Sequence, residues 1–230
     1  MTALVLLPGM MCDARLFGPQ IAALCATCTL HLPPIGGHDT VQALAAEILS
    51  QAPPCFALAG LSMGGIVAME IIAQAPERVT RLALLDTNPL AETAQAQARR
   101  LPQIARVMAS GLDAIMRDEM KPLYLGNTPH RAEILDLCMD MARALGPETF
   151  ARQSHALAAR PDQTETLKRY TRPALILMGE HDILCPKPRH DLMHALMPQS
   201  RLAVIPGAGH LPTLEKPTET TAELRRWLEE

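Results

Sequence analysis

A serine stands among glycines between two apolar stretches, in the segment Gly60-Leu61-Ser62-Met63-Gly64. The pattern G-x-S-x-G is typical of a sharp turn from a buried strand into a helix, which holds the serine hydroxyl out as a nucleophile. Such a turn needs glycines beside it because neighbouring backbones crowd it. A dinucleotide fingerprint would need glycine in place of Ser62, and a phosphate-binding loop would need a following Gly-Lys-Ser/Thr. The five residues alone still allow a tight turn without chemistry.

A serine hydroxyl is a poor nucleophile unless a base and an orienting acid assist it. Asp182 follows the apolar segment 174–178, and His210 follows the apolar segment 201–205. The chain order Ser62, Asp182, His210 matches the serine-hydrolase template. Since the carboxyl ends of parallel strands meet at one edge of a sheet, we expect these three side chains to lie together there.

Asp86 is a second candidate for the acid, because it also ends an apolar segment. We prefer Asp182, which lies in the sequence Gly-Glu-His-Asp at 179–182. Asp86 is expected to cap the turn into Asn88-Pro89.

Short apolar runs alternate with longer helical patterns, which predicts an α/β fold with a parallel sheet covered by helices on both faces. The runs are continuously apolar, as strands buried on both faces are. The predicted strands are 3–7, 27–32, 55–61, 79–86, 174–178 and 201–205. The predicted helices are 19–25, 41–52, 63–75, 187–197 and 217–229.

The interval between the fourth and fifth strands has helical patterns and no convincing strand. Helical spacing relates Ile134, Leu137, Cys138, Met141 and Leu145. An earlier stripe consists of Leu101, Ile104, Ala105 and Met108. We expect a single domain with a core of residues 1–88 and 172–230 and a small helical cap of about residues 89–171. The cap must bury its apolar stripes on the edge of the sheet or over a site.

The segments Gly-x-Ser-x-Gly-Gly at 60–65, Gly-Glu-His-Asp at 179–182 and Gly-x-Gly-His at 207–210 resemble the α/β-hydrolase family. Within it they are most similar to small bacterial serine esterases and carbon–carbon bond hydrolases, over nearly the whole chain. The resemblance implies a mostly parallel sheet of about six strands, with the cap between the fourth and fifth. It also implies Ser62 as nucleophile, His210 as general base and then acid, and Asp182 as the residue that orients His210.

The chain departs from the family pattern after its first strand. The family usually reads His-Gly there, where a backbone N–H completes the oxyanion hole, but this chain reads Pro8-Gly9-Met10. Matching by position makes the backbone N–H groups of Met10 and Met63 the two oxyanion donors. The leading hairpin of the family has no counterpart, so we expect strand 3–7 to lie inside the sheet.

These features predict a hydrolase of small or medium carboxylic esters that works through an acyl-enzyme intermediate. The cap is short and apolar, and the sequence shows no cluster of Arg or Lys that would receive a highly charged acid. The same triad leaves three alternatives open: carbon–carbon bond hydrolysis or lyase chemistry, acyl transfer or perhydrolysis, and a non-catalytic small-molecule receptor. The resemblance implies no metal or organic cofactor.

Composition favours a small-molecule substrate. The chain has 230 residues, of which 48% are hydrophobic, and a net charge of −3. This charge gives no reason to expect nucleic acid or an anionic membrane as a partner. No apolar run reaches the length that a bilayer requires, and the first residues lack the basic region of a leader. Six irregularly spaced cysteines fit a reducing cytoplasm, where we expect the protein to act.

Three further patterns are interpreted as structural. His190 and His194 are spaced like a metal-binding pair, but Leu192, Ala195 and Leu196 form the apolar stripe, so both histidines are expected on the solvated face. The pair Cys25 and Cys28 is expected to serve packing, while Cys12 and Cys185 lie near the predicted pocket. The thirteen methionines suit either an adaptable pocket or core packing.

Overall fold

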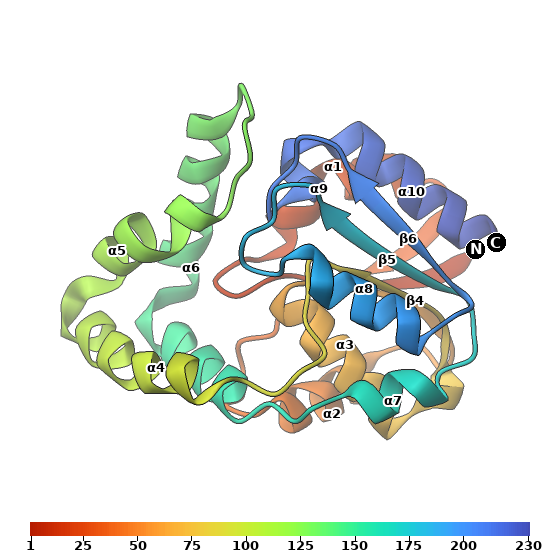
Figure 1. Cartoon of the computed structure of the whole chain (residues 1–230), viewed down its shortest axis with the longest axis horizontal. Coiled ribbons are helices and arrows are strands. Elements are labelled where there is room, and N and C mark those ends of the chain that lie inside the picture. Colours follow the sequence, from red (N-terminus) through yellow and green to blue (C-terminus); the bar gives the residue numbers. More distant parts are fainter.

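The computed structural model describes all 230 residues, and its centre is one six-stranded sheet (Figure 1). Its strands are β1 (Thr2–Leu7), β2 (Cys28–His31), β3 (Phe56–Leu61), β4 (Val79–Leu85), β5 (Ala174–Gly179) and β6 (Ser200–Ile205). They pair in parallel in the order β2-β1-β3-β4-β5-β6. The predicted parallel sheet is therefore confirmed, and β1 lies inside it as expected.

Helices cover both faces of the sheet. On one face lie α1 (Gly18–Leu24) and α10 (Pro217–Glu229), and on the other lie α2 (Val41–Gln51), α3 (Met63–Gln74) and α8 (Lys187–Leu196). Successive residues of a strand point to opposite faces of the sheet. Leu4 packs in the apolar layer under α1 and α10, and Val5 packs in the layer under α2, α3 and α8. The strands are continuously apolar because both of their faces are buried.

The segment between β4 and β5 holds α4 (Ala94–Arg106), α5 (Leu112–Ile115), α6 (Arg131–Ala158) and α7 (Thr164–Arg169). Helices α4, α5 and α6 form a cap beyond the carboxyl ends of the strands (Figure 1), whereas α7 packs against α3 and α8. The division at residues 89 and 171 therefore stays a prediction. None of the helices has both the length and the apolar character needed to cross a bilayer.

Helix α6 contains the predicted amphipathic segment 134–145. Ile134, Cys138 and Met141 are buried in the same apolar layer as α1 and α10. The helix is interrupted at Gly146, whose φ is +78°, and Pro147 follows. A second half of α6 therefore starts in a new direction, and its Ala156 and Leu157 pack in the apolar cluster of α2, α3 and α8, which the sequence pattern did not predict.

The predicted apolar stripe of α4 was wrong except at Ile104. The helix forms and Ile104 packs against the core, but Ala105 is exposed, and Leu101 and Met108 are 67% and 51% exposed. The inward side carries Ala96 and Arg100 instead, which line the pocket described below. Arg100 faces inward because it binds the buried carboxylate of Glu92.

The expectation for α8 was wrong at His190. This side chain is completely buried, and it shares the inner face of the helix with Met193. Together with Met197, these two residues form the helix face that meets the sheet. This face is shifted by one residue from the predicted stripe. His194 is half-buried, and its Nδ1 lies 2.8 Å from Ser200 Oγ.

Burial of His190 predicts that stability depends on pH. Desolvation lowers the pKa of this imidazole to about 4 from its usual 6.5. The unfolded chain therefore takes up a proton in this window that the folded protein does not, so stability falls as pH falls. We expect protonation of His190 in the unfolded chain to lower the free energy of unfolding by about 2 kcal/mol from pH 7 to pH 5. Urea unfolding of His190→Asn should show a flatter pH dependence, whereas His155→Asn, at an exposed position, should match wild type. An equally steep dependence in His190→Asn would contradict this assignment.

Candidate active site

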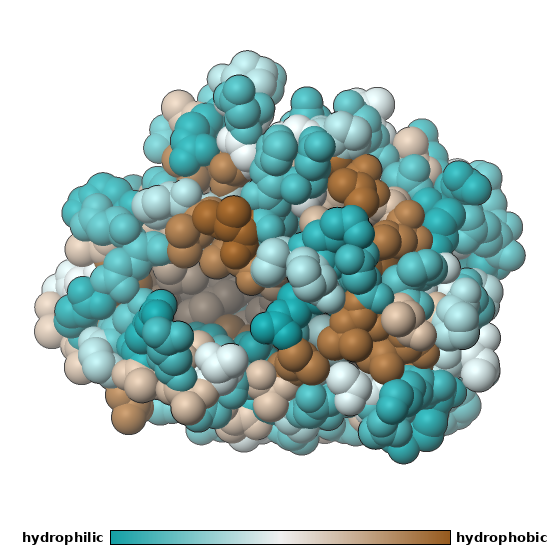
Figure 2. All heavy atoms as spheres, in the orientation of Figure 1, coloured by the Kyte–Doolittle hydropathy of each residue, from teal (hydrophilic) through white to brown (hydrophobic).

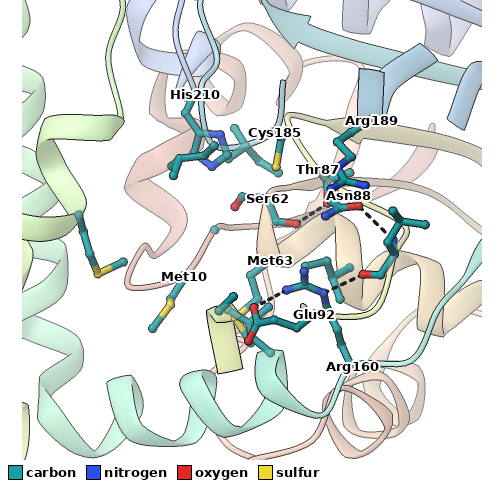
Figure 3. A pocket seen from close by; sticks show the side chains of 18 of the residues that line it. Met10, Ser62, Met63, Thr87, Asn88, Glu92, Arg160, Cys185, Arg189 and His210 are labelled. Carbon is teal, nitrogen blue, oxygen red and sulfur yellow. Dashed lines mark hydrogen bonds and ion pairs between the residues drawn. The ribbon is translucent and has the colours of Figure 1, made fainter. Parts of the chain in front are cut away.

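Ser62 occupies the turn between β3 and α3. Its backbone has φ of +54° and ψ of −115°, a conformation that non-glycine residues rarely adopt. The flanking glycines make it possible: a Cβ at Gly60 would lie 2.3 Å from the Gly64 carbonyl oxygen, and one at Gly64 would lie 2.1 Å from the Leu7 oxygen. The Ser62 side chain consequently faces the pocket (Figure 3).

Backbone bonds fix the Ser62 turn in place. The Ser62 N–H donates to the Leu85 oxygen at 2.9 Å. Its carbonyl oxygen accepts from the hydroxyl of buried Thr87 at 2.7 Å and from the Gly65 N–H at 3.0 Å. Thr87 directly follows β4, so the strand beside β3 also stabilises the Ser62 turn.

His210 and Asp182 form a buried pair at the same edge of the sheet. His210 Nδ1 lies 2.9 Å from Asp182 Oδ2, and both residues are 4% exposed. Asp182 Oδ1 accepts the N–H groups of Leu184 at 2.8 Å and Cys185 at 3.0 Å. Burial alone would raise the pKa of Asp182, but its hydrogen bond to His210 and the imidazolium charge outweigh this and lower it to about 2. With Nδ1 bound to a carboxylate, Nε2 is the ring nitrogen left for proton transfer.

Asp86 does not cap the turn into Asn88-Pro89, so that prediction was wrong. Its Oδ1 accepts the N–H of Gly179 at 2.8 Å, and its side chain is completely buried. The turn is instead closed by Asn88, whose Oδ1 accepts the Leu90 N–H at 3.0 Å. Burial and the nearby carboxylate of Asp182 raise the pKa of Asp86 well above its usual range. Burial therefore favours the neutral form of Asp86, which lies behind the His210–Asp182 pair.

The loop after β1 is a tight turn. The Cys12 N–H donates to the Gly9 oxygen at 3.1 Å, and Met11 has a φ of +55° at the third position of the turn. Type II turns require such a φ there and usually place glycine at that position. A methionine therefore holds a strained conformation beside the pocket.

A residue of the cap supports this turn. The Met11 N–H donates to Gln153 Oε1 at 2.9 Å, and Gln153 Nε2 donates to the Ile35 oxygen at 3.1 Å. Gln153 lies on the second half of α6 and is 1% exposed. These bonds occupy the Met11 amide and leave that of Met10 free. No sequence pattern singled out Gln153, because the bond joins segments 142 residues apart.

The His210 loop is held by Glu215 of α9 (Pro212–Glu215). Its carboxylate accepts three backbone N–H groups, those of Gly126, Gly209 and Leu211, at 2.8 to 3.1 Å. The His210 N–H donates to the Tyr124 oxygen of the cap segment at 2.7 Å. The cap therefore braces both the histidine loop and the turn after β1.

These elements enclose a cavity of about 420 Å³ between the cap and the carboxyl edge of the sheet. Figure 2 shows the hollow on the surface, with apolar residues at its floor. Met10, Met63 and Met120 line it together with Ser62 and His210. Other methionines, including Met116, Met139 and Met141, are packed in the core. Both of the predicted uses of methionine are therefore present.

Cys12 and Cys185 line the pocket as expected. Burial raises the pKa of both thiols well above the usual value, so they stay protonated and weakly nucleophilic at neutral pH. Ligand atoms of Cys185, Asp182 and His210 lie within 4.8 Å of one another. This is the one group of side chains whose ligand atoms lie close enough to bind a metal ion together. Two of its members, His210 and Asp182, are already hydrogen-bonded to each other.

The expectation that no arginine cluster faces the site was wrong. Arg100, Arg160 and Arg189 all line the pocket, together with Glu92. They come from three separate parts of the chain, so no run of basic residues in the sequence revealed them. The cavity has apolar walls and a cationic side.

Comparisons with known proteins identify the family of this chain. Residues 4–224 match the model of the alpha/beta hydrolase family. Pimeloyl-[acyl-carrier protein] methyl ester esterase of Xanthomonas oryzae pv. oryzae is 28% identical, over 98% of this chain and 94% of its own. The protein of the same name from Nitrosomonas europaea is 24% identical, over 94% of this chain and 91% of its own.

Solved structures give the same result. The malate-bound thermophilic esterase from Thermogutta terrifontis superimposes with a TM-score of 0.90 at 29% identity, covering 100% of this chain and 90% of its own. The enol-lactonase from Burkholderia xenovorans LB400 has a TM-score of 0.86 at 21% identity, with 100% and 92% coverage, which shows a shared fold. The prediction of an enzyme of the esterase class agrees with these relatives, and the chain belongs to the alpha/beta hydrolase family.

Proposed function

We propose that this enzyme hydrolyses small or medium carboxylic esters through a Ser62 acyl-enzyme, with His210 and Asp182 completing the triad. The observation that carries the proposal is the buried bond between His210 Nδ1 and Asp182 Oδ2, beside a serine held in a strained turn. Ser62 and His210 line the same cavity (Figure 3). This combination of nucleophile, base and orienting acid is what acyl transfer requires.

In the first half of the reaction, His210 Nε2 accepts the proton of Ser62 Oγ as the oxygen attacks the ester carbonyl carbon. The carbonyl oxygen becomes negatively charged and receives hydrogen bonds from the amides of Met10 and Met63. Met63 opens α3, where the first N–H groups of a helix have no acceptor within the helix. The imidazolium then gives its proton to the leaving alcohol, and the acyl group remains on Ser62.

Water completes the second half. His210 accepts a proton from the water as its oxygen attacks the acyl carbon, and the same two amides hold the second oxyanion. The proton then returns to Ser62 Oγ as the carbon–oxygen bond breaks and the acid leaves. Asp182 stays ionised throughout, because its pKa of about 2 lies far below neutral pH, and it stabilises the imidazolium in both halves.

The cavity limits the size of the substrate. A space of about 420 Å³ is within the range of small-molecule sites and favours short or medium acyl groups. Two named relatives are methyl ester esterases, which supports methyl esters as the first compounds to assay.

A chain-length series of methyl alkanoates tests this proposal. We expect kcat/KM to be highest between butanoate and decanoate and to fall steeply by hexadecanoate, because the longer chain exceeds the cavity. Ser62→Ala, checked for its fold by circular dichroism, should hydrolyse none of them. Turnover by Ser62→Ala at the wild-type rate would contradict the mechanism, and an undiminished rate with hexadecanoate would contradict the size limit.

A further inference from the structure

The charged residues of the pocket do not balance one another. Three guanidinium groups and one carboxylate, those of Arg100, Arg160, Arg189 and Glu92, face the cavity. Asp182 lies nearby, but it is bound to His210, and Asp86 does not line the cavity. The cationic side of the pocket therefore carries more positive than negative charge.

Glu92 is fully used by two of these arginines. Its Oε1 accepts from Arg100 Nη2 at 2.6 Å and from Arg160 Nη1 at 3.0 Å, while its Oε2 accepts from Arg100 Nε. Arg160 Nε also donates to the Leu90 oxygen at 3.0 Å. A guanidinium carries five N–H donors. Arg160 Nη2 and Arg100 Nη1 consequently have no acceptor within the protein.

These groups are far from ordinary surface charges. The side chains of Glu92, Arg160 and Arg100 are 4%, 11% and 16% exposed. Desolvation lowers the pKa of Arg160, which shows how little water surrounds this cation. Placing an unbalanced positive charge in such surroundings costs free energy unless an anion compensates it.

Arg189 adds a third cation that is not part of this cluster. It lies on α8 and is half-buried, and its guanidinium forms no hydrogen bond or ion pair with another residue. Figure 3 shows its side chain extending toward Thr87 and Asn88, near Ser62, whereas Arg160 and Glu92 meet on another part of the pocket wall. A purely structural role in fastening the cap would account for the bonds of Glu92, but not for Arg189.

We infer that the pocket holds a carboxylate-binding subsite and that the preferred substrates are esters carrying a free carboxylate a few bonds from the scissile carbonyl. This inference rests on the proposed function and narrows its substrate class. Arg189 receives the carboxylate near Ser62, and the unbalanced positive charge of Arg160 and Arg100 adds to its attraction, while Ser62 attacks the ester. Planar guanidinium groups suit carboxylates because they offer paired N–H donors.

Matched substrates test the inference. Monomethyl adipate carries the carboxylate, whereas methyl hexanoate and dimethyl adipate are neutral compounds of similar length. We expect wild type to prefer the monoester by roughly tenfold in kcat/KM, as a charge-assisted hydrogen bond provides. A second arm uses the butanoyl ester of glycolic acid against butyl butanoate, which tells whether the carboxylate belongs to the acyl or the alcohol part.

Arginine variants connect the preference to the subsite. Arg189→Gln should reduce the preference for the monoester roughly tenfold, mainly through KM, and Arg100→Gln should reduce it as well. Arg99→Gln is the matched control, since Arg99 lies on α4 beside Arg100 but is exposed and outside this pocket. An undiminished preference in Arg189→Gln and Arg100→Gln, or none in wild type, would overturn the inference.

A binding measurement separates this inference from the proposed function. Calorimetry on Ser62→Ala should show tighter binding of monomethyl adipate than of methyl hexanoate, and the difference should disappear in Ser62→Ala with Arg189→Gln. This readout requires no turnover. Equal binding of the two esters would overturn the subsite even if wild type hydrolyses neutral esters, whereas a preference for monomethyl adipate in a protein that hydrolyses no ester would contradict only the proposed function.

Discussion

Asp182→Asn should lower kcat by about four orders of magnitude while leaving KM nearly unchanged. The His210 Nδ1–H donates to Asp182 Oδ2, so the unprotonated ring nitrogen is Nε2, which is left for Ser62. An amide NH₂ at this position favours the opposite tautomer and removes the charge that stabilises the imidazolium. Stopped-flow and steady-state assays with one methyl ester at several pH values provide the measurement.

Asp86→Asn is the matched control for that substitution. Asp86 lies at the same edge of the sheet, but burial raises its pKa and so favours its neutral form, and an asparagine keeps both the shape and an acceptor for the Gly179 N–H. We expect it to lower kcat by less than about tenfold. A loss in Asp86→Asn as large as that in Asp182→Asn would make Asp86 the orienting acid.

Gln153→Leu should lower kcat by roughly 10- to 100-fold, because it removes the support of the loop that holds the Met10 amide, the proposed oxyanion donor. The Met11 N–H would lose its acceptor, and the strained φ of Met11 would be free to relax. Affinity for a boronic acid that forms a tetrahedral adduct on Ser62 should fall in parallel with kcat/KM. Affinity for a planar product acid should change little, since a planar acid has no tetrahedral oxyanion that the donor amides must stabilise.

Gln163→Leu is the control for loss of a buried glutamine. Gln163 is 4% exposed and donates to Glu70 Oε2 at 2.7 Å, on the side of the molecule where α7 packs. It should lose stability without the selective loss of tetrahedral-adduct affinity. If both variants behaved alike, Gln153 would serve stability only.

The core of the fold was predictable because its determinants are local. The elbow around Ser62 needs glycines at fixed positions, and each strand shows its burial as a continuous apolar run. Asp182 and His210 were recognisable because each follows such a run. The edge of a parallel sheet then brings them together without further information.

The remaining features depend on packing between distant segments. His190 is buried because the inner face of α8 is displaced by one residue from the stripe that hydrophobicity indicates. Gln153 reaches the loop after β1 only because α6 turns at Gly146. The arginines of the pocket come from α4, from the segment that follows α6 and from α8, so their convergence has no sequence signature. Contacts of this kind follow from tertiary structure rather than from local pattern.

The central claim is that Ser62 is the nucleophile, and covalent labelling tests it most directly. A fluorophosphonate probe forms a stable bond to a serine oxygen that a neighbouring base activates. Peptide mass spectrometry should find the probe on Ser62 in wild type, and intact-mass measurement should find none on folded Ser62→Ala. Labelling of another residue, or no labelling of folded wild-type protein that hydrolyses esters, would contradict the account.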